Sequence, residues 1–353
     1  MRVLILNRRD IHNPQGGGAE RYTHEVAKGL RQRGCQVVVF SSRFPGSERR
    51  QETEGVLYIR RGSELTVHLW GLLYALRHRR DFDFMIEEFN GLGFFTFLVP
   101  ARRRLLLVHQ LYREFWFREL GLLGAIPYVL EPLLLRCYRG LPAVVVSAST
   151  GQDLRALGFR RIHVVLNALS TEPLRELPQK SARPTLMFLG RLRATKRPED
   201  ALKIFRLLKE QLPQAQLWMV GSGPMQEQLR RQAPRDVVFY GWVGEQEKLR
   251  LLRQAHVLLV PSVREGFGIN VLEAASQGTP AVGYDVPGLR DSIRDGQTGF
   301  LARGPQEAAQ KALRLLTEPE LLEEMGRRCL SYSRDFNWRQ RAEEFWAVLR
   351  GLE

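Results

Sequence analysis

Two carboxylates, Glu265 and Glu273, stand eight positions apart on either side of a glycine-rich turn. The run 255–260 before the turn is short and aliphatic and stops at a proline, which predicts a buried parallel strand. The run 269–277 after the turn has apolar residues at helical spacing and stops at Gly278. A helix that begins at such a turn offers backbone N–H groups to a phosphate or another anion, and carboxylates accept hydrogen bonds from a polyol. Taken alone, the pair is more often a turn residue and a solvated helix carboxylate.

The strand and helix around this turn belong to a regular alternation along the chain. Strands are predicted at 3–6, 36–41, 56–60, 84–87, 104–109, 143–147 and 163–166, and a second series restarts at 185–189, with helices between them. This alternation predicts an α/β fold of doubly wound sheets, and 353 residues suit two domains. The periodicity fails around 167–184, where prolines stand among charges. We therefore place an N-terminal domain at 1–168, a linker at 169–184 and a second domain at 185–336.

Charge and cysteine content limit the possible partners and compartment. The chain has 53 basic and 38 acidic residues, a net charge of +15, and most of the excess lies in the N-terminal half. This charge can attract nucleic acid, an anionic membrane or anionic substrates, but the arginines are dispersed and no nucleic-acid-binding motif is present. Cys35, Cys137 and Cys329 have no metal-ligand spacing, which favours a reducing compartment, by default the cytoplasm, over disulfides or zinc.

The segment 111–138 mixes aromatic and leucine side chains with arginines. A basic amphipathic surface of this kind can lie on a membrane as a peripheral contact. A helix packed on the domain core explains the same pattern. Prolines and a glutamate interrupt the most apolar part, 120–135, so we expect no bilayer span.

Three further groups of residues could take part in chemistry. His109 closes the apolar run 105–108 at the carboxyl end of a predicted strand, where open α/β sheets bind their ligands. The run Gly16-Gly17-Gly18 could be interpreted as the glycine-rich turn of a dinucleotide-binding motif. It begins several residues after its strand, however, and no glycine stands at the spacing where that motif has its third one. The pair Asp81 and Asp83 stands where a strand begins, away from the expected ligand edge, so we interpret it as structural.

The motifs around the first turn extend over residues 264–300. They comprise Glu265-Gly266-Phe267-Gly268, Glu273-Ala274-Ala275, Gly278-Thr279-Pro280, Pro287-Gly288-Leu289 and Asp295-Gly296-Gln297-Thr298-Gly299-Phe300. This series resembles the signature of the retaining nucleotide-sugar glycosyltransferases of family 4, which have the GT-B fold. The resemblance implies two Rossmann-like domains that face a central cleft, and a terminal helix at 337–353 that crosses back to the N-terminal domain. It also implies transfer of a sugar from a UDP- or GDP-linked donor to a glycan, a lipid-linked or a small-molecule acceptor, as in polysaccharide biosynthesis, with no metal or other cofactor.

The same resemblance assigns roles to individual residues. Arg191 and Lys196 match positions that bind the donor diphosphate, where two cations neutralise the charge that develops as the glycosidic bond breaks. Glu273 is expected to hold the ribose hydroxyls, Glu265 to orient the sugar, and His109 to lie beside that sugar. The implied catalytic set is Glu265, His109, Arg191 and Lys196. The implied donor-binding set is Gly17, Gly18, Gly190, Arg191, Lys196, Gly221, Val243, Phe267, Gly268, Ile269 and Glu273, and no metal site is expected.

The sequence departs from the family pattern at two places and leaves two alternatives. Asn167-Ala168 stands where the family usually has Asn-Gly, and Arg197 stands where it has a glycine. One alternative is a nucleotide-sugar epimerase of the same fold, which would consume the donor without an acceptor. The other is a non-catalytic basic protein that binds nucleic acid or membrane, which explains the charge and leaves the site motifs unexplained.

Overall fold

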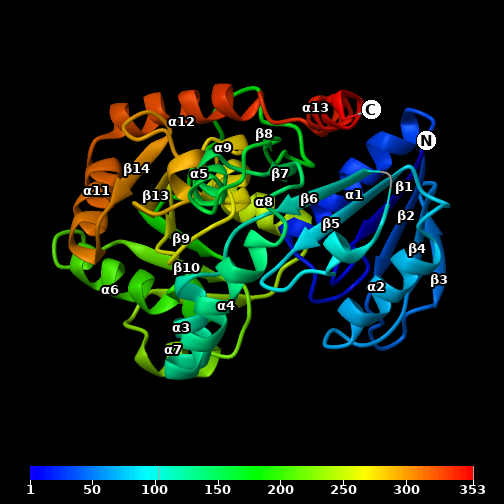
Figure 1. Cartoon of the computed structure of the whole chain (residues 1–353). Helices are drawn as coiled ribbons and strands as arrows, with labels where there is room; N and C mark the ends of the chain where they lie inside the picture. Colours follow the sequence, from blue (N-terminus) through cyan, green and yellow to red (C-terminus); the bar gives the residue numbers. More distant parts are fainter. Residues whose placement is uncertain (102, 353) are drawn as a thin grey trace. The chain divides into compact units, whose positions relative to one another are not determined.

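The computed structural model describes residues 1–101 and 103–352 and divides the chain into two compact units (Figure 1). Unit 1 contains Met1–Phe117, Leu122–Ala168 and Asn337–Glu353, and unit 2 contains Arg118–Gly121 and Leu169–Phe336. Each unit has its own sheet with helices packed on it. The α/β doubly wound class predicted from the sequence is therefore confirmed.

The sheet of unit 1 has eight strands in the order β3-β4-β2-β1-β5-β6-β7-β8. The strands are β1 (Arg2–Leu6), β2 (Gln36–Ser41), β3 (Arg50–Thr53), β4 (Val56–Arg60), β5 (Phe84–Phe89), β6 (Arg103–Val108), β7 (Ala143–Val145) and β8 (Ile162–Val164). Only the β3–β4 pair is antiparallel among the described pairings. Because the other strands are parallel, the loops at their carboxyl ends gather at one edge of the sheet.

The helices of this unit cover both faces of the sheet. They are α1 (Gly18–Gln32), α2 (Val67–Arg77), α4 (Ala125–Arg136), α5 (Ala148–Ala156) and α13 (Trp338–Gly351), with short 3-10 turns η1 (Thr96–Leu98) and η2 (Gly121–Gly124), and α3 (Glu114–Leu120) spans the division between the units. The crossovers from β1 to β2 and from β4 to β5 run in opposite directions, so right-handed connections place α1 and α2 on opposite faces. Helix α13 packs on α1: a Cβ atom on Gly29 would lie only 2.3 Å from the Cβ atom of Ala342.

The sheet of unit 2 has six parallel strands in the order β11-β10-β9-β12-β13-β14. They are β9 (Thr185–Leu189), β10 (Gln216–Val220), β11 (Val237–Gly241), β12 (Val257–Val260), β13 (Ala281–Tyr284) and β14 (Gly299–Ala302). The helices are α6 (Pro198–Lys209), α7 (Gln226–Gln232), α8 (Glu245–Gln254), α9 (Ile269–Ser276), α10 (Leu289–Ser292), α11 (Pro305–Thr317) and α12 (Pro319–Ser333), with the turn η3 (Ala194–Lys196). Alternate residues of the strands enter two separate cores, as Leu186 and Met187 of β9 do.

The strand order of unit 2 reverses direction between β9 and β12. The chain runs outward from β9 through β10 to β11, and then restarts on the other side with β12, β13 and β14. The loops that follow β9 and β12 therefore leave the sheet in opposite directions. The place between such loops at the carboxyl edge is the usual ligand site of an open α/β sheet, and we call this place in unit 2 the crevice.

Several segments have roles that the sequence pattern did not specify. Residues 169–184, expected as a linker, make backbone hydrogen bonds within unit 2, such as Leu174 N–H to the carbonyl of Ser276 at 2.9 Å. Strand β3 was not predicted.

Asp83 accepts a hydrogen bond from the N–H of Arg2 at 2.7 Å, and Asp81 pairs with His78, so both aspartates have structural partners. Among the described residues, no helix is long and apolar enough to cross a membrane.

Candidate functional site

The crevice of unit 2 brings together residues from four neighbouring strand ends. Gly190 follows β9, Gly221 follows β10, Val243 follows β11, and Glu265 lies in the loop after β12. The side-chain amide of Asn270, at the start of α9, donates to the carbonyl of Leu189 at 3.0 Å. This hydrogen bond fastens the helix that follows β12 to the end of β9, across the point where the strand order reverses.

Glycines allow the loops at this edge to pack backbone against backbone. Gly221 has a φ of 125°, and a Cβ atom there would lie 2.0 Å from the carbonyl oxygen of Gly190. Gly190 N–H donates to Val220 O at 3.0 Å, and Gly221 N–H donates to Gly241 O at 2.7 Å. Any side chain at Gly221 would therefore push the two loops apart.

Lys196 and Glu265, which are 69 positions apart in the sequence, form an ion pair in this crevice. Lys196 Nζ lies 2.5 Å from Glu265 Oε1, and the hydroxyl of Ser262 donates to the same oxygen at 2.6 Å. The Glu265 side chain is 10% exposed and that of Lys196 is 27% exposed, so the pair is shielded but open on one side. Its loop is fixed by the Glu265 N–H, which donates to Pro287 O at 3.0 Å. A ligand at this place would meet one cation and one carboxylate in fixed positions.

The turn Glu265-Gly266-Phe267-Gly268 leads directly into α9. Gly268 precedes the helix with a φ of 86°, a conformation that favours glycine, and a Cβ atom there would lie 2.9 Å from Ser292 Oγ. Phe267 is buried against the ring of Phe336, at a centroid distance of 5.8 Å, and anchors the turn. The backbone N–H groups of Phe267, Gly268 and Ile269 thus stand at the positive end of a helix.

Glu273 lies one turn inside α9 and is paired with a cation. Lys248 of α8 donates from Nζ to Glu273 Oε1 at 2.7 Å and is also 3.0 Å from Glu245. The Glu273 side chain is 17% exposed, so a ligand can reach it from solvent. Sequence reasoning did not single out Lys248 or Ser262. Both lie on elements next to the predicted site, but nothing in their own spacing distinguishes them.

Arg191 and Val243 occupy the outer part of the same edge. Arg191 follows Gly190 and its side chain is exposed, and Val243 is half-buried against the core between β10, β12 and α9. The structure therefore gathers the predicted set of unit 2 around one crevice.

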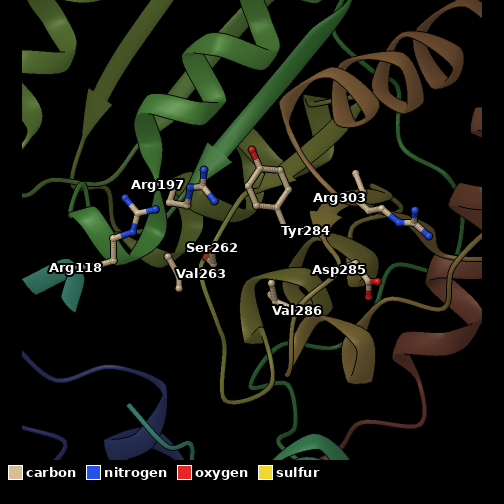
Figure 2. Close-up of a pocket in the computed structure, with 9 residues that line it drawn as sticks. Arg118, Arg197, Ser262, Val263, Tyr284, Asp285, Val286 and Arg303 are labelled. Atoms are coloured by element: carbon tan, nitrogen blue, oxygen red, sulfur yellow. The ribbon is translucent and has the colours of Figure 1, made fainter. Parts of the chain in front are cut away.

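A pocket of about 310 Å³ lies beside this crevice, at the carboxyl ends of β12, β13 and β14 (Figure 2). Ser262, Tyr284 and Arg197 line it. Arg197 has a φ of 48°, which lies in the left-handed region that favours glycine, the residue that the family has at this position. Its guanidinium pairs with the buried Asp200 at 2.6 Å and lies 5.1 Å from the centre of the Tyr284 ring.

Unit 1 carries a second pair of interacting polar side chains at its own carboxyl edge. His109, after β6, is 7% exposed, and its Nε2 lies 3.3 Å from Oε2 of Glu88 on β5. Burial raises the pKa of Glu88, although interactions with His109 and Thr23 oppose the rise. Among residues 1–101 and 103–352, neither His109 Nε2 nor Glu88 Oε2 makes a hydrogen bond of good geometry. This edge therefore places an imidazole beside a buried carboxyl group.

Sequence reasoning found His109 and missed Glu88. The available signal was the pair Glu87-Glu88 within a strand that is buried along its whole length. Glu87 is structural, because it accepts hydrogen bonds from Tyr138 at 2.6 Å and from the N–H of Thr96 at 3.0 Å.

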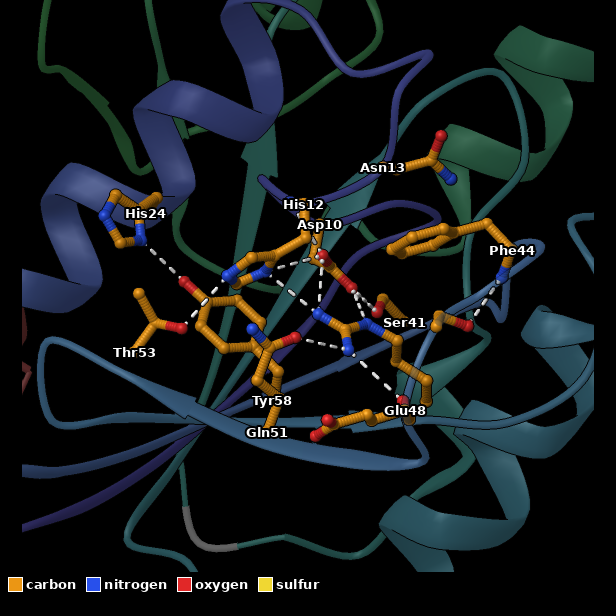
Figure 3. A network of polar contacts seen from close by, with 12 residues as sticks. Asp10, His12, Asn13, His24, Ser41, Phe44, Glu48, Gln51, Thr53 and Tyr58 are labelled. Atoms are coloured by element: carbon orange, nitrogen blue, oxygen red, sulfur yellow. Dashed lines mark hydrogen bonds and ion pairs between the residues drawn. The ribbon is translucent and has the colours of Figure 1, made fainter.

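The loop between β1 and α1, which ends at Gly17, is held at Asp10 by a buried ion pair (Figure 3). Arg60 at the end of β4 contacts both carboxylate oxygens of Asp10, at 2.6 and 3.1 Å, and both side chains are fully buried. Burial alone would raise the pKa of Asp10, but hydrogen bonds from Arg60 and Ser41 outweigh it and lower that pKa below its usual value. Gly17 precedes α1, and its N–H donates to the carboxylate of Glu20 at 2.7 Å. In the described part of the chain, no group of three His, Cys, Asp or Glu residues is arranged to hold a metal ion.

Two family models match consecutive parts of the chain. Residues 16–173 match the model described as Glycosyltransferase Family 4, and residues 171–330 match the one described as Glycosyl transferases group 1. The D-inositol 3-phosphate glycosyltransferase of Streptomyces griseus is 36% identical over 178 residues, which is 46% of this chain and 37% of that protein. The chain spans about a third to two fifths of the length of the curated relatives it matches.

Solved structures resemble the whole chain at low sequence identity. Sucrose-phosphate synthase from Thermosynechococcus elongatus aligns with a TM-score of 0.82 and 17% identity, covering 99% of this chain and 98% of that one. HepE from Anabaena, solved in complex with UDP and glucose, aligns with a TM-score of 0.73 and 15% identity, covering 100% of both chains. These likenesses concern the fold.

Proposed function

Because the chain belongs to glycosyltransferase family 4 and has the GT-B fold, we propose that it is a retaining glycosyltransferase that uses a nucleoside diphosphate sugar. The sugar would pass to a glycan, a glycolipid or a small-molecule acceptor held mainly by unit 1. The observation that carries the proposal is the pairing of Lys196 with Glu265 at the point where the strand order of unit 2 reverses. A cation and a carboxylate there suit a ligand that joins a phosphate to a sugar.

The roles of the donor-site residues follow from their positions. Lys196 and Arg191 would bind the diphosphate and stabilise the negative charge that grows on it as the bond to the sugar breaks. Glu273 would accept hydrogen bonds from the ribose hydroxyls, with Lys248 fixing its orientation. Glu265 and the backbone N–H groups of residues 267–269 would orient the sugar.

We propose front-face attack for the chemical step. The acceptor oxygen bonds to the anomeric carbon on the face from which the diphosphate leaves, and the acceptor proton passes to an oxygen of the leaving phosphate. Retention of configuration follows, because the bond forms on the side where the old bond breaks. His109 and Glu88 place an imidazole and a buried carboxyl group 3.3 Å apart at the edge where parallel sheets bind ligands.

The cations of the protein are proposed to replace a divalent metal ion. Arg191 and Lys196 supply the positive charge that a metal would otherwise give to the departing diphosphate. Turnover should therefore continue in EDTA. Complete loss of turnover in EDTA, restored by manganese, would overturn this part of the proposal.

The donor is best tested by thermal stabilisation with UDP, GDP, ADP and their sugar conjugates. A ligand bound only by the folded protein raises its stability by about 2.7 kcal/mol at a hundredfold excess over the dissociation constant. Selective stabilisation by one nucleotide would support the donor site and identify the base. Consumption of the stabilising donor without an acceptor, with release of an isomeric sugar, would instead indicate an epimerase.

For location, we propose the cytoplasm, with peripheral contact at the inner face of the membrane. Cys35, Cys137 and Cys329 are all unpaired, and Cys137 is exposed, as a reducing compartment permits. Fractionation of cells that express the protein, with and without a salt wash of the membranes, would test this location.

A further inference from the structure

Two helices of unit 1 expose rows of aliphatic side chains to solvent. On α2 and two residues before its start, Leu65, Leu69 and Leu73 recur every fourth position and are 90%, 59% and 46% exposed. The row on α4 and the turn before it comprises Leu122, Leu123, Ile126, Val129, Leu130 and Leu133, which are 48% to 92% exposed. We name these two rows together the aliphatic face.

Helix α4 has the reverse of the polarity expected for a helix that faces water. Its glutamate, Glu131, is 1% exposed and points inward, where it accepts backbone hydrogen bonds from Tyr112 at 2.7 Å and Arg113 at 2.9 Å. Leu135 is buried on the same inner side. These contacts fix the rotation of the helix about its axis. Its outer side, which would normally carry charged residues, is aliphatic instead.

The two rows lie on the same face of the unit 1 sheet. In the sheet register, Leu4 of β1 pairs with Met85 of β5, and Met85 pairs with Arg104 of β6, so these three side chains point to one face of the sheet. Side chains two residues apart on a strand share a face, so Leu106 also points to the face of Leu4. Leu4 packs in the core with residues of α2, and Leu106 packs in the core with residues of α4. Figure 1 shows α2 and α4 on the lower side of this sheet. Leu98, between the two helices in sequence, adds a further side chain that is 60% exposed.

Arginines follow each aliphatic row at the C-terminal end of its helix. Arg77, Arg79 and Arg80 follow the row of α2, and Arg136 and Arg139 follow the row of α4. The acidic side chains that flank these two helices in the sequence are Glu64, Asp81, Asp83, Glu114 and Glu119, and Glu131 on α4 is buried. Glu64 is paired with Arg9 at 2.7 Å and Asp81 with His78 at 2.7 Å, so much of the acidic charge is balanced locally.

We propose that the aliphatic face docks this protein onto an anionic lipid bilayer, with the aliphatic rows in the interface and the arginines on lipid phosphates. Aliphatic and basic groups side by side match the acyl chains and headgroups of such a surface. A second copy of the chain fits less well, because a two-fold contact through this face brings like-charged arginine groups together. As an extension that rests on the proposed glycosyltransferase function, the acceptor is a lipid-borne one presented at that surface.

The test is flotation of the purified full chain with vesicles, without any sugar donor or acceptor. Vesicles of phosphatidylcholine mixed with phosphatidylglycerol should carry the protein, and vesicles of phosphatidylcholine alone should carry much less, because the arginines meet no net negative surface. Leu122→Ser with Ile126→Ser should lower the partition into anionic vesicles by about tenfold or more, since several buried CH₂ groups are lost. Both side chains are highly exposed, so folding should be preserved.

Matched variants control for exposure and for charge. Val238→Ser changes an exposed aliphatic residue of unit 2 and should float like the wild type. Arg136→Gln with Arg139→Gln should weaken flotation with anionic vesicles, whereas Arg327→Gln with Arg328→Gln on α12 removes the same charge elsewhere and should not.

The flotation results test the docking proposal and do not depend on the proposed donor site. Wild-type protein that stays unbound with anionic vesicles, or aliphatic-face variants that float as the wild type does, would overturn the docking. A dimer that the serine variants convert to a monomer, without vesicle binding, would assign the face to a second copy. Stabilisation by nucleotides, measured on the same samples, reports on the donor site alone.

Discussion

Replacing Lys196 by Met tests the centre of the proposed donor site. Its Nζ is 2.5 Å from Glu265 Oε1, and the variant keeps much of the aliphatic stem while removing the cation. Loss of a charged group that stabilises the transition state typically lowers kcat by about 100-fold or more. We therefore expect turnover of the stabilising donor to fall by about that factor.

The same substitution has a smaller effect on folding. Without Lys196, Glu265 Oε1 keeps one of its two described partners, the hydroxyl of Ser262. The Glu265 side chain is only 10% exposed, so water replaces the lost partner poorly. Because Lys196 is itself 27% exposed, solvent screens the pair, and we expect a loss of about 1–2 kcal/mol rather than the larger cost of breaking a fully buried pair. For a unit of this size, that loss corresponds to a fall in Tm of about 2–8 °C.

A matched control separates the two effects. Lys311 pairs with Glu307 on α11 at 2.6 Å, and its side chain is also 27% exposed, but it lies outside the crevice. Lys311→Met should therefore lower Tm without lowering turnover or nucleotide binding. Turnover is measured with the donor identified by thermal stabilisation, at saturating concentration. Turnover near the wild-type rate in Lys196→Met, with intact folding, would refute the assignment of Lys196 and Glu265.

Three further predictions concern single side chains. Glu273→Gln should weaken binding of the nucleoside diphosphate by about tenfold and leave binding of inorganic pyrophosphate unchanged, because only the ribose hydrogen bonds are affected; calorimetry that shows equal losses for both ligands would contradict the ribose role. Arg60→Met removes the guanidinium partner of the buried carboxylate of Asp10 and should cost about 3–5 kcal/mol in urea unfolding, much of which the added change Asp10→Asn should recover; no recovery would contradict the pairing argument. Burial lowers the pKa of Lys180 to about 7 in the folded protein, from 10.5. Between these pH values the unfolded chain binds more protons than the folded one, so the folding stability contributed by this residue rises with pH. Lys180→Met should remove that rise, and unfolding free energies with the same pH slope as the wild type would contradict it.

The strands could be predicted where the apolar pattern is continuous. The bounds of β2, β4 and β9 agree with those expected from the sequence, because each is a short run of β-branched and aliphatic residues. Strand β3 (Arg50–Thr53) was missed, because its residues are polar and it pairs only at the edge of the sheet. Its single local signal is the turn at Glu54 and Gly55, both of which have positive φ.

The partners of the site residues could not be predicted from spacing. Glu265 and Lys196 were identified separately, each by resemblance, and their contact depends on β9 and β12 being neighbours in the sheet. That order is a property of the fold, because sequence spacing does not determine which parallel strands pair. Glu88 illustrates the same limit. A carboxylate within a buried strand is costly to bury without a partner, but the partners His109 and Thr23 come from other elements.

Arg197 shows why a departure from a family motif needs the structure to interpret it. In a chain with 53 basic residues, an arginine after Lys196 carries little information by itself. The structure shows that Arg197 has a left-handed backbone, which costs a residue other than glycine about 1 kcal/mol or more. The ion pair with Asp200 and the contact with the Tyr284 ring can offset that cost. Because Asp200 is almost completely buried, the guanidinium also neutralises a carboxylate that would otherwise be expensive to keep there. These contacts of Arg197 therefore stabilise the turn after Lys196, whose Nζ reaches Glu265.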